Sequence, residues 1–195
     1  MFVYLSKKLA IGNSVKVTAV SWSMDHNCMA VGADDGIIRI ISNDASSQSL
    51  SHRGLTVKQQ LSGHSTSITG CTWNELHQKL TTSDASGLII VWVSRAKEEY
   101  SEEMVNNRGK SFAVTGLDWS PDGAMIAILY EDGNMIIGSV EGTRLWEKEF
   151  KVICRNVQWN PDSKVLLVGV GDEVQAFDEN GAFSLLRYEF GAISI

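Results

Sequence analysis

The chain has little of what marks several common classes of protein. Its 195 residues include only two prolines and three cysteines, and 8% of them are aromatic. No apolar run approaches the roughly 18 to 20 residues that a membrane-spanning helix needs. At the N-terminus a short apolar stretch precedes a basic pair, whereas a secretory signal begins with its basic residues. We therefore expect neither a transmembrane segment nor a secretory signal.

The three cysteines are Cys28, Cys71 and Cys154, and no CxxC pair occurs. An odd number without that spacing argues against a disulfide framework and against a zinc site. It suits a reducing, intracellular compartment. We expect the three thiols to be small buried apolar groups, with Cys71 on the same strand face as Trp73.

Basic charge is also scarce, with 17 Lys and Arg against 23 Asp and Glu and a formal net charge of -6. Phosphate contacts need clustered Lys and Arg, so nucleic acid is not expected as a main partner. The 44% hydrophobic and 21% charged residues are ordinary for a folded soluble domain. No segment keeps an apolar face at helical spacing, and residues 98–107 also lack one, so no helix is expected.

The sequence does contain an internal repeat, which its tryptophans reveal. Four short runs each end in a tryptophan, at spacings of 51, 46 and 40 residues, and an apolar residue follows each tryptophan seven positions later. A glycine with the chemistry of a hairpin turn comes fourteen positions after each of the first three and opens another strand. These residues are Trp22, Trp73, Trp119, Trp159, Gly36, Gly87 and Gly133.

A repeat of roughly 40 to 45 residues with several short strands is typical of propeller blades. We predict an all-β fold in which residues 1–195 form an incomplete β-propeller, with about four blades of a seven-bladed ring. The expected blades cover residues 15–61, 62–111, 112–151 and 152–187. Residues 1–11 are expected to form a strand that can close the ring.

The candidate site residues are assigned structural roles in the blades. A histidine such as His64 could be a base or a ligand, but beside Gly63 at the start of a blade it is expected to bond neighbouring strands. The adjacent Asp34 and Asp35 are expected in a polar turn, because no third ligand is placed beside them. The assigned residues are Trp22, Asp34, Gly36, His64, Trp73, Asp84, Gly87, Trp92, Trp119, Gly133 and Trp159. No catalytic, cofactor-binding or metal-binding residue is predicted, and the chain is not expected to be an enzyme.

Three further segments carry expectations. Residues 42–60 are expected to form a loop and then an outer strand that leads into the second blade. Residues 95–110 carry both charge signs and are expected to form a solvated loop, with a partner surface as the alternative. Trp146 is extra to the repeat and is expected to cover an outer edge or to mark an exposed contact.

Gly63-His64 and the strand that ends in Trp92 resemble the WD-repeat family. The resemblance is partial, because Ala85 stands at the turn-aspartate position, with Asp84 one residue earlier, and Gly138 stands where tryptophan is usual. On this basis no blade is expected to carry the family's full hydrogen-bonding set.

Longer strings resemble the N-terminal propeller of the WD-repeat protein 35 type subunits of intraflagellar transport complex A. They include YLSKK (4–8), LSGHS and TWNE (within 61–76), and QKLTTSDASGLIIVW (78–92). Members of that family are longer, with two propellers and a helical repeat region, so the chain is expected to correspond to a truncated form with the first four blades.

The resemblance implies a non-catalytic scaffold in retrograde ciliary transport, cilium assembly and the entry of membrane proteins into cilia. It implies other complex A subunits as partners, with ciliary membrane cargo or its adaptors as further ones. The implied location is the cilium, including the axoneme and basal body, and the cytoplasm. The alternative is a WD-repeat adaptor of a vesicle coat or of a ubiquitin-ligase complex, since fold alone does not decide function.

Overall fold

The computed structural model describes residue 11 and residues 14–43, 55–96, 99–107, 112–183 and 188–189. In these residues the strands form four antiparallel sheets of four strands each, and no helix occurs. Within every sheet the strands pair in the order in which they follow one another along the chain. The predicted all-β fold is therefore confirmed.

The strand bounds repeat from sheet to sheet. The first sheet holds β1 (Val17–Ser23), β2 (Cys28–Ala33), β3 (Ile37–Asn43) and β4 (Leu55–Ser62). The second holds β5 (Ile68–Asn74), β6 (Lys79–Asp84), β7 (Leu88–Ala96) and β8 (Glu99–Asn107). The third holds β9 (Val114–Trp119), β10 (Met125–Tyr130), β11 (Asn134–Ser139) and β12 (Arg144–Glu149). The fourth holds β13 (Val157–Trp159), β14 (Val165–Val170), β15 (Glu173–Asp178) and β16 (Tyr188–Glu189).

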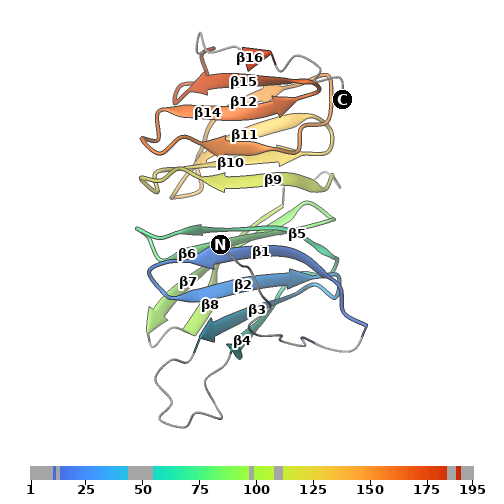
Figure 1. Ribbon diagram of the computed structural model, residues 1–195, viewed down its shortest axis with the longest axis vertical. Coiled ribbons are helices and arrows are strands. Elements are labelled where there is room, and N and C mark those ends of the chain that lie inside the picture. Colours follow the sequence, from blue (N-terminus) through green and yellow to red (C-terminus); the bar gives the residue numbers. More distant parts are fainter. Residues whose placement is uncertain are drawn as a thin grey trace, which may run out of the picture.

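In Figure 1 the strands of the first and second sheets share the lower half of the molecule, and those of the third and fourth sheets share the upper half. The first strands of the sheets contact each other in turn, since β1 meets β5, β5 meets β9, and β9 meets β13. The outer strands β4 and β8 also meet, where the Gln59 carboxamide bonds the backbone N–H and C=O of Tyr100 at 2.8 Å each. Meander sheets arranged with their first strands together are the blades of a propeller.

Three apolar clusters fill the spaces between consecutive sheets. Strand β10 shows the pattern most clearly, because its MIAILY run is buried on both faces. Ile126 and Ile128 belong to the cluster shared with the second sheet, whereas Ala127 and Leu129 belong to the cluster shared with the fourth. The alternation explains why a single blade would leave both apolar faces open to water.

The turn between the second and third strand of a blade needs glycine. Gly133 has a φ of +83°, and a Cβ built there would collide with the carbonyl oxygen of Phe150. Gly36 has a φ of +76°, and its Cβ would lie 3.0 Å from the carbonyl oxygen of His64. Both turns therefore combine a left-handed backbone with close passage of the segment that leads to the next sheet.

The expectation of a single loop over residues 95–110 was wrong, because β7 continues to Ala96 and β8 occupies residues 99–107 as the outer strand of the second sheet. Strand β8 buries Tyr100, but the six Glu, Ser and Asn residues of the strand conceal this in the sequence. In the 42–60 segment the expected outer strand is present as β4, which pairs with β3 and completes the first sheet before the chain enters the second. The strand expected over residues 1–11 lies outside the described residues, except for residue 11.

None of the three cysteines forms a disulfide bond in the structure. Cys28 and Cys154 are buried, as expected, whereas Cys71 is only partly buried as a residue. Its thiol faces the first sheet, 3.9 Å from the carbonyl oxygen of Ala30, and burial raises its pKa to about 12. A thiol with so high a pKa is a poor nucleophile near neutral pH.

Candidate functional site

A buried chain of hydrogen bonds crosses the second sheet at His64. His64 Nδ1 lies 3.0 Å from Asp84 Oδ2, and His64 Nε2 lies 2.7 Å from Thr82 Oγ1. The indole of Trp92 donates to the same hydroxyl at 2.8 Å. Neither the His64 nor the Asp84 side chain is exposed to solvent. The histidine thus joins the segment before β5 to strands β6 and β7.

Burial and hydrogen bonding set the protonation of this pair. Burial lowers the pKa of the His64 imidazole below its usual value, and this effect outweighs the opposing influence of Asp84. Burial would raise the pKa of the Asp84 carboxyl, but hydrogen bonds from Ser86 and His64 outweigh it and hold the pKa low. A neutral imidazole against an ionised carboxylate fits a structural role.

The expectation that no blade carries the full hydrogen-bonding set was wrong for the second blade. Asp84 is the last residue of β6, and its carboxylate also accepts from the backbone N–H of Ser86 and Leu88. Ala85, at the position where the family pattern places aspartate, instead bonds the carbonyl of Ser67 through its backbone N–H. An aspartate one residue earlier therefore reaches both the turn and the histidine.

The four repeat tryptophans lie at the ends of β1, β5, β9 and β13, and their surroundings differ. Trp73 donates to the carbonyl of Ser21 in the preceding sheet at 3.2 Å, and Trp119 donates to Thr81 Oγ1 at 3.0 Å. Trp159 is 2% exposed, and its Nε1 has no hydrogen-bond partner. Trp22 is 44% exposed, because the described residues place no sheet on that side of β1.

The remaining assigned residues occupy turns. Gly87 has a φ of +86° in the turn that follows Asp84. Asp34 accepts a hydrogen bond from the backbone N–H of Lys16 at 2.9 Å and so fastens the start of β1. The neighbouring Asp35 is used in an ion pair with Arg39 at 2.6 Å, which fits a turn rather than a metal ligand.

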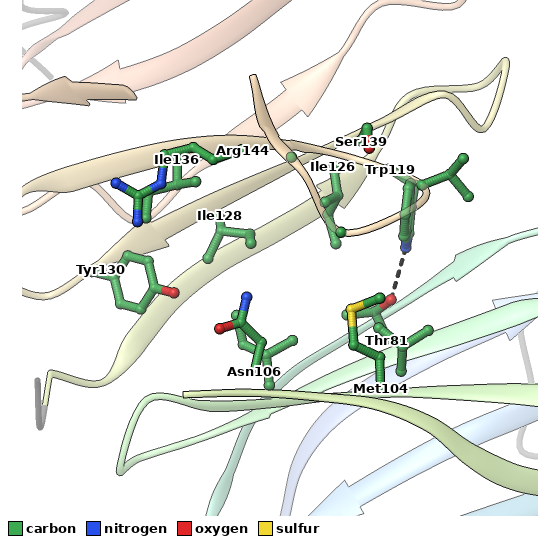
Figure 2. Close-up of a pocket in the computed structure, with 15 residues that line it drawn as sticks. Thr81, Met104, Asn106, Trp119, Ile126, Ile128, Tyr130, Ile136, Ser139 and Arg144 are labelled. Carbon is green, nitrogen blue, oxygen red and sulfur yellow. Dashed lines mark hydrogen bonds between the residues drawn. The ribbon is translucent and has the colours of Figure 1, made fainter. Parts of the chain in front are cut away.

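Sequence reasoning did not foresee a cavity between the second and third sheets, drawn in Figure 2. Its volume is about 170 Å³. Ile126, Ile128 and Ile136 form one wall, and Met104 and Asn106 of β8 approach from the opposite side. The only sequence signal for it was Gly138, the glycine in the interior of β11.

Polar groups lie around this cavity rather than deep in it. The Thr81 hydroxyl is already occupied by Trp119, as the dashed line in Figure 2 shows. Arg144, on β12, is paired with Glu147 at 2.8 Å, and both side chains are 55% exposed. Asn106 is exposed and has no side-chain hydrogen bond to a described residue. The cavity therefore has apolar walls and a polar opening.

A second unusual group lies where the third and fourth sheets meet. Asp118, in β9, accepts hydrogen bonds from the backbone N–H of Trp159 at 2.7 Å and from the Gln158 carboxamide at 2.9 Å. Burial raises the pKa of its carboxyl to about 6, and the Trp159 hydrogen bond only partly offsets that effect. Asp118 is thus a carboxylate whose charge is costly at neutral pH.

Within the described part of the chain, no three His, Cys, Asp or Glu side chains are grouped so that they could hold a metal ion. The same residues include no helix with the length and hydropathy of a membrane span. Trp146, the tryptophan outside the repeat, is partly buried against Phe177 and donates to the carbonyl of Glu179 at 2.9 Å. It therefore connects the third sheet to the fourth.

The fold and its blade-locking hydrogen bonds define a WD-repeat β-propeller of which the chain holds an incomplete ring. A chain of the crystal structure of the mitotic checkpoint complex has the same fold, with a TM-score of 0.75 over 93% of this chain and 53% of that one, at 24% identity. A family model described as WDR35/TULP4 N-terminal matches residues 1–188. The chain belongs to this family.

Two kinds of relative bear this out. Human WD repeat-containing protein 35 is 44% identical over 209 aligned residues, which cover 100% of this chain. Mouse tubby-related protein 4 is 37% identical over 143 residues, or 69% of this chain. The chain spans 18% of the length of the first relative and 9% of the second.

Proposed function

We propose that the chain is part of a non-catalytic scaffold of intraflagellar transport complex A, which supports retrograde ciliary transport, cilium assembly and the entry of membrane proteins into cilia. The observation that carries the proposal is the 44% identity to WD repeat-containing protein 35 along the entire chain. Homology of this kind supports a WD-repeat scaffold in general, and the ciliary role is what the proposal adds to it.

The proposed domain organisation is a partial propeller over residues 1–195, with blades at 15–61, 62–111, 112–151 and 152–187 and with residues 1–11 closing the ring. The eleven residues assigned structural roles would hold these blades. The low pKa of His64 and its enclosure between Asp84 and Thr82 support a structural part for that histidine rather than a chemical one.

The proposed partners are other complex A subunits, with ciliary membrane cargo or its adaptors as further ones. The proposed location is the cilium, at the axoneme and basal body, and the cytoplasm. A candidate contact is β8, an edge strand whose residues Glu99, Glu102 and Glu103 are exposed. Edge strands with a charged outer row can recruit a partner while resisting edge-to-edge aggregation.

The proposal is tested by recovering the tagged chain from ciliated cells and identifying what comes with it. Other complex A subunits are expected, and vesicle-coat or ubiquitin-ligase subunits in their place would overturn the proposal. Reversing the charge of Glu99 and Glu102 tests β8. The same change at Glu147 and Glu149 of β12, the outer strand of the third sheet, is the matched control. If both charge reversals abolish the recovery of complex A subunits, the effect comes from the overall charge of the chain and not from β8.

A further inference from the structure

The cavity between the second and third sheets exists where the repeat leaves out a side chain. In the second sheet, Leu80 pairs with Trp92 across β6 and β7, and in the third sheet Ile126 pairs with Gly138 across β10 and β11. Gly138 thus occupies the place of Trp92. In the fourth sheet the equivalent partner of Leu166 is Phe177, which is fully buried. Of the three sheets that follow another described sheet, two have an aromatic residue at this position and the third has Gly138.

The space at Gly138 is open in the direction a side chain would take. A Cβ at this residue would come only within 3.4 Å of Ile126 and 3.7 Å of the Thr143 carbonyl, which is ordinary contact. Gly138 has no positive φ, so its backbone is compatible with any L residue. The glycine is therefore not required by the turn or by the backbone, unlike Gly133.

From this register we propose that the cavity binds one aromatic side chain, a tryptophan or phenylalanine, presented by a partner protein. The volume of about 170 Å³ is close to that of an engineered apolar cavity of about 150 Å³ that binds benzene, and it falls well below the size of pockets for larger ligands. The cavity contains no buried charged group to hold the polar part of a metabolite. The equivalent places in the neighbouring sheets are filled by protein aromatic rings.

The opening of the cavity suits a partner segment. It lies between the outer strands β8 and β12, each of which has one side unpaired in the described sheets. Met104 spans it toward the turn at Gly142, where an added Cβ would meet the Met104 sulfur and methyl at 2.7 Å. A flexible thioether can move aside for a ring and then pack against it. Beside it, the exposed Asn106 can bond the backbone of the segment that carries the ring.

The test uses the 195-residue chain and the probe N-acetyl-L-tryptophanamide, observed by NMR. We expect saturable binding and nuclear Overhauser contacts from the indole to the methyl groups of Ile126, Ile128 and Met104. Filling the cavity from within with Gly138→Trp should weaken probe binding at least about tenfold, as expected for loss of a buried ring contact. Leu76→Trp, which adds an indole at a turn residue that is 68% exposed, should leave the binding unchanged.

Contacts at other residues, or equal binding to the Gly138→Trp variant, would overturn the proposal. Binding of free indole without binding of the amide probe would also overturn it, because the site would then accept a small free aromatic compound and exclude a ring attached to a chain. The methyl contacts of the unaltered chain decide the matter even if Gly138→Trp fails to fold. The inference rests on the cavity alone, so probe binding and recovery of complex A subunits can succeed or fail separately.

Discussion

His64 Nδ1 lies 3.0 Å from Asp84 Oδ2, and neither side chain has any exposed surface. The same carboxylate accepts from the backbone N–H groups of Ser86 and Leu88, so one group connects the segment entering the second sheet with the turn between β6 and β7. Polar networks of this kind stabilise when every member is satisfied and destabilise when one partner is missing.

Replacing Asp84 with alanine should lower the free energy of unfolding by about 2 to 4 kcal/mol, because the imidazole and two backbone N–H groups lose their acceptor. Asp178→Ala is the control: Asp178 also accepts two turn N–H groups, from Asn180 and Ala182, but has no histidine partner. Because both of these hydrogen bonds are exposed to solvent, Asp178→Ala should lower the free energy of unfolding by no more than about 1 kcal/mol. Chemical denaturation measures both, and equal losses would show that the histidine adds nothing.

The lowered pKa of His64 predicts a pH dependence of stability. At pH values between the usual histidine pKa of 6.5 and the lower pKa of His64 in the folded chain, the unfolded chain binds a proton that the folded chain does not. Stability should therefore fall as the pH drops from about 7.5 through 6.5, and the fall should be smaller in His64→Gln. Parallel denaturation curves for the two proteins would mean that the fold accommodates the protonated ring.

The repeat was readable from the sequence because each blade meets the same local demands. Tryptophan ends the first strand, and glycine allows the positive φ of a turn, as at Gly133. These are short-range requirements, so they leave a regular spacing. Strand β8 was missed because an outer strand buries only a few side chains, and its single fully enclosed aromatic, Tyr100, does not make a pattern.

The functional features were less visible because they depend on contacts between sheets. The reach of Asp84 to His64 spans 20 residues, and Asp118 meets Trp159 across 41. The cavity at Gly138 depends on what β8 and β12 place around it, and a glycine in a strand gives only a hint of such a space. Contacts between residues so far apart in the chain are set by the packing of the sheets, and local patterns in the sequence do not specify that packing.

The first two repeat tryptophans should differ in their contribution to stability. Trp73 is 8% exposed and donates to Ser21, so Trp73→Ala should cost about 3 to 5 kcal/mol. Trp22→Ala should lower the free energy of unfolding far less, because Trp22 is 44% exposed. Denaturation of the two variants measures the difference. A large loss for Trp22→Ala would show that another surface covers it, such as the closing strand proposed for residues 1–11.

The raised pKa of Asp118 predicts the opposite pH dependence from His64. Its folded pKa of about 6 exceeds the usual aspartate value of 3.8, so its contribution to stability is fully present below pH 3.8 and is lost as the pH rises through 6. Asp118→Asn still accepts from the Trp159 N–H but carries no charge. The variant should gain stability relative to the parent as the pH rises from about 4 to about 7.5. A constant difference across that range would contradict the buried charge.

Trp159 offers the sharpest test of the alignment between sheets. Trp119 donates to Thr81, and the residue at the same register in the third sheet is Ala127, which leaves the Trp159 N–H without an acceptor. Ala127→Ser should supply a hydroxyl there and raise the free energy of unfolding by about 1 kcal/mol, the net worth of a typical hydrogen bond.

Its control is Ala30→Ser, the same position in the first sheet, where the neighbouring Trp73 already donates to Ser21. A buried hydroxyl at residue 30 would have no available donor, and it should lower the free energy of unfolding because burying a polar group without a partner costs free energy. Thermal and chemical denaturation of the two variants compare them directly. A gain at residue 30 equal to that at residue 127 would show that the serine acts through packing and that the two positions do not differ in the donor they face.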